Sequence, residues 1–565
     1  MVLISNIHKQ SNQYIVLIRN FFLILTLLLM TQCMRLQIFN YYYFNNLAQH
    51  NYLKTASIPA TRGQITDRHG HILVDNQLNY SLKLTKKNRA LANELFGIQS
   101  HQNYIPITHQ QILKIKADEK LHDQFEIIFT KKRIYHYGKE LFPVVGYGIY
   151  NGDVFNESTG IEKTYNKILE GQPGYLLNKV SAKGNQENTG KYISSIEGNT
   201  VKLTIDAQLQ KTAYKALGNT KGSVIVLDPN NGEILALVSK PSLDSNNVLE
   251  LYQSKHTLNH KDSPEFNRVT SGLISPGSTI KPFIALAALD HHIVTPNESI
   301  EDKGYLIVGN HKFHDWLKEG HGSVNLRKAI AVSCDTFFYV LAKKMGINLI
   351  TDTLNEFGFG HQTHLDLPNE SNGLVPTPTW KRENRASNWY TGDTIITTIG
   401  QGALLTTPIQ LANATAILVN EGFFYDPHLL KTTVDHAGDE YQPIHVKKYI
   451  RPIAHEHYEL VKRAMQDVIT KPYGTGNYSF GPRPYSIAGK TGTTQVTSHH
   501  NIKPSGPLPK HLENHSLFIG FAPVKNPKVV IVTISENSQL NAATVSRKIL
   551  DQYFRSLNAD NEILY

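Results

Sequence analysis

The sequence predicts an α+β protein with three parts: an N-terminal transmembrane helix, a mixed β-rich pedestal module, and a C-terminal domain with an antiparallel sheet flanked by helices. Three observations support this fold class. A long apolar run lies near the N-terminus, short alternating segments with turn residues follow it, and apolar strand patterns alternate with helical stretches in the second half. The chain has 565 residues, 40% of them hydrophobic and 18% charged, so it is long enough for several domains with buried cores.

The first part is a membrane anchor expected over residues 15–38. The centre of this segment is free of charged residues, and its length suits a single span of a bilayer. Lys9 and Arg19 precede that centre, which favours a cytoplasmic tail of residues 1–14 and an outward-facing body. A cleaved signal peptide is the alternative. However, no small-residue cleavage site follows, and the aromatic run at 41–44 suits an anchor at the outer interface.

A non-catalytic pedestal module is expected over residues 39–205. Segment 61–73 carries turn residues between short alternating strands. Segment 158–165 has the pattern of a short helix, which the glycine- and proline-containing segment 171–174 closes. Residues 85–140 are polar, and their topology stays open at this point.

The C-terminal domain is expected over residues 206–565. It starts with a helical stretch at 207–217, and an Asn-Gly turn joins two apolar strands within 222–238. Two further strand patterns occur at 487–496 and 528–535. Because helical stretches separate these strands, we expect an antiparallel sheet covered by helices.

Charge and cysteine content narrow the class of protein. The net charge is +10, with lysines and arginines scattered along the chain, which fits a protein beside anionic lipid or an anionic polymer. We find no nucleic-acid motif and expect no nucleic-acid partner. The two cysteines are Cys33, beside the membrane segment, and Cys334, far along the chain, so we expect no disulfide between them.

Three short motifs carry the chemistry. In chain order they are Ser278-Thr279-Ile280-Lys281, Ser333-Cys334-Asp335 and Lys490-Thr491-Gly492-Thr493. The first alone is weak support, because such a pattern also arises by chance or as a simple helix cap. All three in this order are the pattern of penicillin-recognising serine acyltransferases and β-lactamases.

The first motif can supply a nucleophile and its base. Pro282 has no amide hydrogen and is tolerated only in the first turn of a helix, which predicts a helix start near Ser278. Ser278 and Lys281 then share one helix face, so the lysine amine, if neutral, can take the proton of the serine hydroxyl. Burial and the nearby cation of Lys490 would both favour the neutral amine.

The chain resembles the class B penicillin-binding proteins, and within that class the elongation-specific penicillin-binding protein 2, nearly from end to end. The resemblance rests on Arg62-Gly63 with Asp67-Arg68, Gly160-Ile161-Glu162, Leu203-Thr204-Ile205-Asp206, Asp228-Pro229 with Gly232, Asn267-Arg268, Pro276 to Pro282, Trp389 to Thr394, and Gly400-Gln401-Gly402 with Thr407-Pro408. It implies a dimerisation-like pedestal and a transpeptidase domain. It also implies a peptidoglycan D,D-transpeptidase that crosslinks stem peptides in the periplasm during cell elongation and rod-shape maintenance, and that β-lactams acylate.

The resemblance also implies roles for the second motif. Ser333 would hydrogen-bond toward Lys281 and relay a proton to the leaving amine. Asp335 stands where many relatives have asparagine, and its carboxylate could pair with a lysine. We therefore expect Asp335 to position its neighbours.

The third motif would bind the substrate. The resemblance assigns Lys490, Thr491, Gly492 and Thr493, on a strand edge, to the terminal carboxylate of a stem peptide ending in D-Ala-D-Ala. The amide groups of Ser278 and Thr493 would form the oxyanion hole. Attack on the penultimate D-Ala carbonyl would release the last D-Ala, and the acyl group would pass to an amine of a neighbouring strand.

A second group of polar residues lies before and beside Ser333. It combines two carboxylates, one imidazole and one thiol: Asp302, Asp315, His321 and Cys334. Such a set suits tetrahedral Zn²⁺, and a metal would account for an unpaired cysteine in an oxidising compartment. By spacing alone, His311 and His314 are equally available, and a buried inert cysteine is the alternative. Because some penicillin-binding protein 2 members resemble this pattern at a structural zinc site, we expect structural zinc here.

Three other functions compete with transpeptidation. A secreted β-lactamase would need no membrane anchor or preceding module, and the chain has no E-x-x-L-N segment. A D,D-carboxypeptidase would differ only in using water as the acceptor. An anchored scaffold or β-lactam sensor would have a vestigial pocket.

We expect partners in the same membrane. The sequence shows no glycosyltransferase domain, so strand polymerisation would come from another protein. The resemblance implies a SEDS-family glycosyltransferase, bound through the membrane helix and the pedestal, and scaffolds of the elongation complex. It places the protein in the inner membrane as a single-pass protein, with its catalytic domain in the periplasm.

Overall fold

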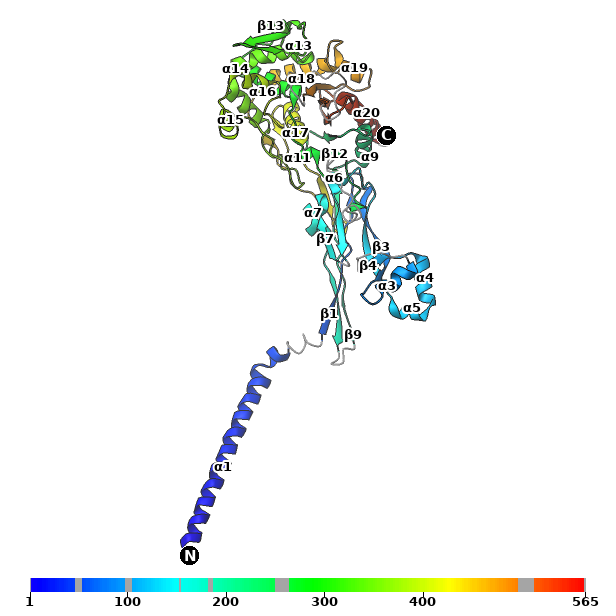
Figure 1. Cartoon of the computed structure of the whole chain (residues 1–565), viewed down its shortest axis with the longest axis vertical. Coiled ribbons are helices and arrows are strands. Elements are labelled where there is room, and N and C mark those ends of the chain that lie inside the picture. Colours follow the sequence, from blue (N-terminus) through cyan, green and yellow to red (C-terminus); the bar gives the residue numbers. More distant parts are fainter. Residues whose placement is uncertain are drawn as a thin grey trace. The chain divides into compact units, whose positions relative to one another are not determined.

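The computed structural model describes residues 2–45, 53–96, 104–151, 154–180, 186–248, 264–495 and 513–562. The chain divides into two compact units (Figure 1), one formed by Met1–Thr61 with Gln172–Glu197 and the other by Arg62–Gly171 with Gly198–Tyr565. This division differs from the expected boundaries at residues 39 and 205, because strands of the expected pedestal pair with strands from the C-terminal half.

The first unit contains the membrane helix and a small sheet. Helix α1 (Val2–Met34) continues into the π-helix η1 (Arg35–Phe39). The segment Ile15–Phe39 is long and apolar enough to cross a membrane, with a mean hydropathy of 2.0 and no buried side chain, in agreement with the sequence prediction. Strands β1 (Leu53–Ile58), β8 (Gly174–Val180) and β9 (Gln186–Ile193) form an antiparallel sheet in the order β1-β8-β9.

In the second unit, one seven-stranded sheet joins segments from distant parts of the sequence. Its order is β19-β18-β10-β2-β3-β4, and β5 also pairs with β3. The strands are β2 (Ile65–Thr66), β3 (Ile72–Lys83), β4 (Tyr104–Pro106), β5 (Glu126–Tyr135), β10 (Thr200–Leu203), β18 (Leu430–Val434) and β19 (Glu440–Tyr441). Strand β10 runs parallel to β2 and antiparallel to β18, so it ties the two halves of the chain together.

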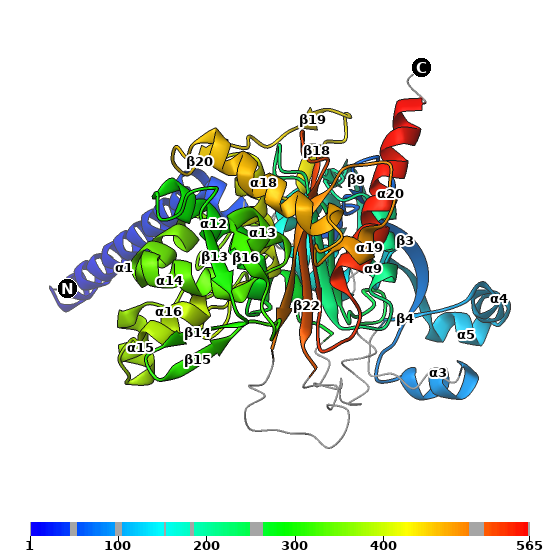
Figure 2. The ribbon, with the colours of Figure 1, turned by 90° about the horizontal axis from the view of Figure 1, so that it is seen from above.

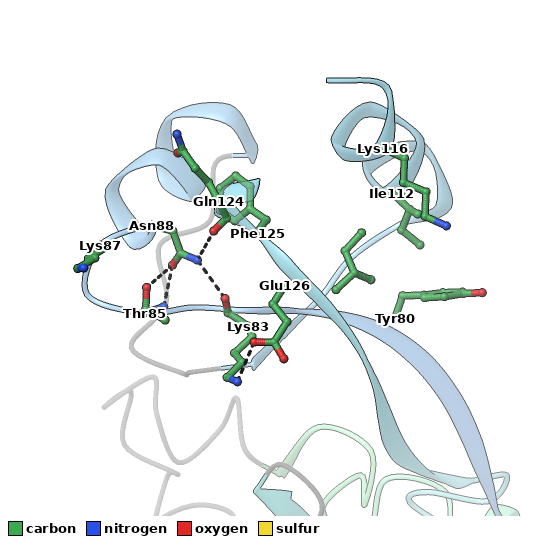
Figure 3. Close-up of a pocket in the computed structure, with 11 residues that line it drawn as sticks. Tyr80, Lys83, Thr85, Lys87, Asn88, Ile112, Lys116, Gln124, Phe125 and Glu126 are labelled. Atoms are coloured by element: carbon green, nitrogen blue, oxygen red, sulfur yellow. Dashed lines mark hydrogen bonds and ion pairs between the residues drawn. The ribbon is translucent and has the colours of Figure 1, made fainter. Parts of the chain in front are cut away.

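The polar region 85–140, whose topology was open, folds into a small lobe at one end of β3. Helices α3 (Arg89–Phe96), α4 (His109–Ala117) and α5 (Glu119–Gln124) pack over a small separate core that includes Leu82, Ala92 and Phe125. Figure 3 shows the contacts of Asn88, which accepts a hydrogen bond from the Thr85 amide and donates to the Lys83 and Gln124 carbonyls.

Short elements connect these sheets. They are α6 (Phe142–Val145), β6 (Gly148–Asn151), β7 (Val154–Ser158), α7 (Gly160–Thr164) and α8 (Asn166–Leu169). The predicted short helix at 158–165 is therefore confirmed as α7. Within α7, the carboxylate of Glu162 is fully buried and pairs with the guanidinium groups of Arg62 and Arg133, both at 2.7 Å.

The second sheet of this unit carries the site. It is antiparallel, in the order β12-β11-β23-β22-β21. Its strands are β11 (Gly222–Leu227), β12 (Ile234–Lys240), β21 (Ala488–Thr494), β22 (His515–Ala522) and β23 (Val529–Ser535). The hairpin, the helix after residue 206 and both later strands are confirmed within a few residues, although Val496 lies outside the described residues. Helices lie on both sides of the sheet (Figure 2), as the α+β class predicts.

The remaining helices of the second unit surround this sheet. Helices α9 (Ala207–Ala216), α11 (Arg268–Ser271), α17 (Pro408–Val419), α18 (His455–Thr470), α20 (Ala542–Glu562) and the 3₁₀ segment η2 (Gly277–Ile280) contact its strands. The others are α12 (Lys281–Asp290), α13 (Leu326–Ala331), α14 (Asp335–Glu356), α15 (Pro378–Arg385), α16 (Thr391–Thr398) and α19 (Asn477–Phe480).

Three two-stranded antiparallel sheets complete the description of this unit. They pair β13 (Ser299–Asp302) with β16 (Gly322–Asn325), β14 (Tyr305–Val308) with β15 (His311–His314), and β17 (Phe423–Phe424) with β20 (Lys448–Tyr449).

Candidate active site

Ser278 lies on a tight turn at the start of a buried helix. The turn is the 3₁₀ segment η2, and the α-helix α12 begins at Lys281, with Pro282 in its first turn. The helix start predicted near Ser278 is therefore a 3₁₀ turn that continues into an α-helix. Ser278 is half-buried, and the helix behind it is buried on all sides.

Glycine is needed beside Ser278 because two other segments approach the turn closely. Gly277 has φ +54°, a left-handed conformation that favours glycine, and its amide donates to the Gly400 carbonyl at 2.8 Å. A Cβ atom on Gly277 would lie 2.9 Å from the Thr493 carbonyl oxygen of strand β21. The turn is thus held between β21 and the loop after α16.

Lys281 is fully buried and points at the second motif. Its Nζ donates to the Ser333 carbonyl at 2.7 Å and lies 3.4 Å from the Ser333 hydroxyl. The Asp335 carboxylate forms an ion pair with the same amine at 2.7 Å. The sequence-based expectation that an acid at position 335 could pair with a lysine matches this geometry.

The backbone of Ser333 is strained into position. Its φ is +59°, which is rare for a residue with a side chain, and such strain often marks a functional site. The strained residue sits between α13 and α14, and Cys334 caps α14 by accepting the Phe337 amide hydrogen at its Sγ. This arrangement places Asp335 on the first turn of α14.

Lys490 lies on β21, the edge strand of the sheet. Its side chain is fully buried, and its amine donates to the Thr491 carbonyl at 3.0 Å. Burial, and then the positive charge of Lys281, hold the pKa of Lys490 well below its ordinary value, while the Asp335 charge acts in the opposite direction. The two lysines are therefore close enough to repel each other.

Among the remaining residues of the third motif, Gly492 lies on the side of β21 that faces the turn. A Cβ atom on Gly492 would lie 2.8 Å from Thr279 Cγ2, so this glycine lets the strand approach η2. Thr493 is exposed and Thr491 is half-buried. No measured contact tests the predicted oxyanion role of the Ser278 and Thr493 amides, which stays a prediction.

Thr475 is a site residue that the sequence analysis missed. Its hydroxyl lies 2.6 Å from that of Thr491, and its amide donates to the Ala331 carbonyl two residues before Ser333. It therefore connects β21 with the second motif. The signal was available in the segment Tyr473-Gly474-Thr475-Gly476, where glycines flank one hydroxyl residue.

The four residues considered for zinc converge at the base of α14. One ligand atom from each of Asp302, Asp315, His321 and Cys334 lies within 4.8 Å of the others. His321 Nδ1 is 2.8 Å from Asp302 and 3.6 Å from Asp315. Burial, and then the charge of Asp315, raise the pKa of the Cys334 thiol. His311 and His314 are exposed on β15 and belong to no metal-ligand group among the described residues.

Two other features do not resemble an active site. A wide cavity of about 910 Å³ in the small lobe (Figure 3) is lined by residues such as Tyr80, Asn88 and Lys116. Its polar groups include Asn88, which hydrogen-bonds within the lobe. A second acidic group, Glu421 with His455 and Glu459, is bridged by the ammonium of Lys462, which takes the place of a metal.

A serine at a helix start, a buried lysine three residues later and a lysine on the adjoining strand edge are the arrangement of a serine acyltransferase of the penicillin-binding class. The family model described as penicillin binding protein transpeptidase domain matches residues 222–555, and that described as penicillin-binding protein dimerisation domain matches residues 57–115. The chain belongs to the penicillin-binding protein 2 family of peptidoglycan D,D-transpeptidases.

Relatives and solved structures agree with this family. The peptidoglycan D,D-transpeptidase MrdA of Haemophilus influenzae is 34% identical, over 94% of this chain and 90% of the relative. That of Escherichia coli K12 is 32% identical, over 94% and 92%. Penicillin-binding protein 2 of Helicobacter pylori, in complex with MreC, has a TM-score of 0.76 at 27% identity over 89% of this chain and 99% of that chain. Penicillin-binding protein 2 of Pseudomonas aeruginosa, in complex with WCK 5153, has a TM-score of 0.66 at 32% identity, over 88% and 96%.

Proposed function

We propose that Ser278 is the nucleophile of a peptidoglycan D,D-transpeptidase that crosslinks stem peptides ending in D-Ala-D-Ala. One observation carries the assignment: Lys281 from α12, the Ser333–Asp335 segment and strand β21 all meet at the turn that holds Ser278. Three motifs that are distant in the sequence thus form one constellation.

The constellation supports a two-step acyl transfer. The Ser278 oxygen attacks the carbonyl carbon of the penultimate D-Ala, and its proton passes to the Lys281 amine, whose own extra proton first moves to the Asp335 carboxylate that pairs with it. The Ser278 and Thr493 amides stabilise the oxyanion. The bond to the last D-Ala breaks, and Ser333 relays the proton to the leaving amine.

In the second step, an acceptor amine attacks the ester carbonyl of the acyl-enzyme. The amine loses a proton, the new amide forms, and the Ser278 oxygen regains its proton. Lys490, Thr491 and Thr493 hold the terminal carboxylate during the first step, while Gly492 lets the strand approach the turn. A penicillin would follow the first step and stop there, because its leaving group stays attached.

Intact-mass spectrometry tests the assignment of Ser278. The full-length protein in detergent is exposed to a penicillin beside Ser278→Ala. We expect one stable adduct on the parent and none on the variant. Rapid loss of the adduct would indicate a β-lactamase, and no adduct on the parent would indicate a closed or vestigial pocket and hence the scaffold function.

A stem peptide with and without an acceptor amine separates transpeptidation from carboxypeptidation. We expect a crosslinked product when the amine is present. Release of D-Ala with only the hydrolysed peptide as product would make the protein a D,D-carboxypeptidase.

We further propose an inner-membrane, single-pass protein with its catalytic domain in the periplasm and a role in cell elongation. The apolar segment Ile15–Phe39 supports the anchor. As partners we propose a SEDS-family glycosyltransferase and elongation scaffolds. A relative has been solved in complex with MreC, and another similar structure is described as a peptidoglycan synthase complex. Exchange of Ile15–Phe39 for an unrelated membrane helix should weaken co-purification with the glycosyltransferase, and unchanged co-purification would contradict the helix contribution.

We also propose a structural Zn²⁺ bound by Asp302, Asp315, His321 and Cys334. The donor set fits zinc in number and chemistry, and the four ligand atoms are already gathered in a buried site. A bound metal would compensate the two neighbouring carboxylates and join β13 to the start of α14. Elemental analysis should give about one zinc per chain, and chelation should lower the melting temperature. Protein purified without chelator that lacks zinc would refute this proposal.

A further inference from the structure

A second pocket, of about 310 Å³, lies between α15 and α16. Two tryptophans, Trp380 of α15 and Trp389 before α16, form part of its wall together with Ile396. The half-buried tryptophans and the partly exposed Ile396 give it flat apolar surfaces open to solvent. Such surfaces suit the aliphatic part of a peptide ligand.

Most polar groups of this pocket are already paired. The Trp389 indole donates to the Thr394 hydroxyl at 2.8 Å. Lys381 forms an ion pair with Asp393 at 2.6 Å, and Asp393 also accepts the Tyr390 amide hydrogen at 2.7 Å. These contacts fix the aromatic walls and leave little capacity to bind a charged ligand.

Arg385 is the exception. It lines the pocket from the last turn of α15 and is exposed. Within the described ranges, no carboxylate pairs with it. Its guanidinium group is therefore available to an external carboxylate, for which its planar fork of donors is well suited.

The pocket is connected directly to the turn that carries the nucleophile. Its floor includes Ile396 and Gly402, and the Ile396 carbonyl accepts the Gln401 amide hydrogen. The Gly400 carbonyl accepts the amide hydrogen of Gly277, the neighbour of Ser278, at 2.8 Å. Gly402 follows Gly400 by two residues, and consecutive Cα atoms are about 3.8 Å apart. The pocket residue Gly402 therefore lies close in the chain to the residue that hydrogen-bonds to that turn.

We propose that this pocket is a subsite for the peptide stem, in which Arg385 binds a carboxylate that the reaction does not consume and the tryptophans hold the adjoining aliphatic part. The inference rests on the proposed function, which already assigns the terminal carboxylate to Lys490 and its neighbours. The carboxylate at Arg385 is thus a second one, internal to the stem. It belongs to the donor stem or to the acceptor stem, and kinetics can distinguish the two.

The test uses full-length protein in detergent and two stem peptides ending in D-Ala-D-Ala, one with its internal carboxylate free and one with it amidated. For Arg385→Gln we expect kcat/KM for the acidic stem to fall about ten-fold, the size of about 1.4 kcal/mol. The amidated stem should react equally with parent and variant. Acylation by penicillin should keep its rate. Arg382→Gln, on the same helix but outside the pocket, is the matched control and should change none of these values.

Two further arms complete the design. If only the acidic acceptor is affected, with release of D-Ala from the donor unchanged, the bound carboxylate belongs to the acceptor stem. Trp380→Ala should weaken the acidic and amidated stems equally, because it removes an apolar wall.

Failure of the subsite and failure of the proposed function give different results. If penicillin and the stems react but Arg385→Gln leaves the preference for the acidic stem unchanged, the subsite is wrong. If the parent is not acylated by either reagent, the catalytic assignment is wrong. Calorimetry then tests the subsite proposal by itself, through the binding of the two stems to Ser278→Ala and to the double variant that also carries Arg385→Gln. If the double variant loses the preference for the acidic stem, the subsite is supported. If the preference is unchanged, the subsite is overturned.

Discussion

Two buried lysines, Lys281 and Lys490, lie near one carboxylate, that of Asp335. Asp335 forms its ion pair with Lys281, whereas Lys490 meets only a backbone carbonyl among its described hydrogen bonds. A buried ammonium without a carboxylate partner is costly, and the pKa of Lys490 is lowered accordingly by burial and by Lys281. A substrate carboxylate beside Lys490 would remove part of this cost, so the site favours an anionic ligand.

Lys490→Met should therefore stabilise the fold and impair substrate binding. Between the lowered native pKa and the ordinary value of 10.5, the unfolded chain binds a proton that the native protein does not. The contribution of Lys490 to the stability of the parent is thus greatest above pH 10.5 and falls as the pH falls toward the native pKa. At pH 7 we expect the free energy of unfolding of the variant to exceed that of the parent by about 1–2 kcal/mol. The difference should shrink toward pH 10.

Chemical unfolding at pH 7 and pH 10 measures this difference in stability. Turnover of a stem peptide by Lys490→Met should fall about ten- to a hundred-fold, because a charge-assisted hydrogen bond to the substrate is lost. Lys548→Met, at an exposed position of α20, is the control and should leave both values unchanged. A variant that is less stable at pH 7 would mean that Lys490 is charged and paired in the native protein.

Thr475→Val tests the residue that sequence reasoning missed. The hydroxyl pair between Thr475 and Thr491, at 2.6 Å, orients one wall of the substrate site. Its loss should slow acylation by penicillin about two- to ten-fold, the equivalent of about 0.5–1.5 kcal/mol. Time-resolved intact-mass spectrometry measures this rate. Thr470→Val, at an exposed position of α18 where the hydroxyl donates to the Gln466 carbonyl, should keep the parental rate.

At the scale of elements, the site depends on how closely backbones approach each other. Gly277, Gly400 and Gly492 occupy points where strand, turn and loop meet with no room for a side chain. The strands themselves were predictable, because apolar residues predominate in runs such as β11 and β23. The 3₁₀ geometry at Ser278 was not, since Pro282 fixes only that a helix starts nearby.

Gly400→Ala should disable acylation more than it destabilises the protein. Its φ is +74°, and a Cβ atom would lie 2.2 Å from the Gly277 carbonyl oxygen, which must then move together with the turn. The left-handed conformation alone costs about 1–2 kcal/mol for alanine. Gly309→Ala isolates that cost, because Gly309 has φ +59° and no atom within 4 Å of its Cβ position.

We expect both glycine variants to lower the melting temperature, but only Gly400→Ala to lower the acylation rate, by about ten-fold or more. Thermal unfolding and the adduct assay measure the two effects. Equal acylation by both variants would show that the Gly277–Gly400 contact does not position Ser278.

At the scale of the whole molecule, long-range pairing decides what the sequence could not show. Strand β2 has only two residues, yet it joins β10 and β3 in a sheet that also contains β18. No local pattern announces such a short strand. The small lobe was equally hidden, because its helices are short and its core is small. The catalytic constellation was predictable since its residues are chemically distinctive wherever the chain places them.

Glu162 provides the last test, because it holds together segments that are distant in the sequence. Its carboxylate pairs with Arg62 and Arg133, and all three side chains are almost completely buried. Glu162→Gln keeps the shape but leaves two buried guanidinium groups without a counter-ion, so we expect a loss of about 3–5 kcal/mol in unfolding free energy. Glu170→Gln, which alters an exposed hydrogen bond to Asn166, should change stability by less than about 1 kcal/mol.

Chemical unfolding measures the decrease in unfolding free energy caused by Glu162→Gln. Two probes follow the unfolding: resistance to proteolysis reports on the region 62–171, and formation of the penicillin adduct reports on the catalytic site. Because both belong to one compact unit, we expect them to be lost together as denaturant is added. If proteolysis of 62–171 occurs at a concentration where the adduct still forms at the parental rate, the two regions fold independently, and the sheet that joins them does not support the catalytic site.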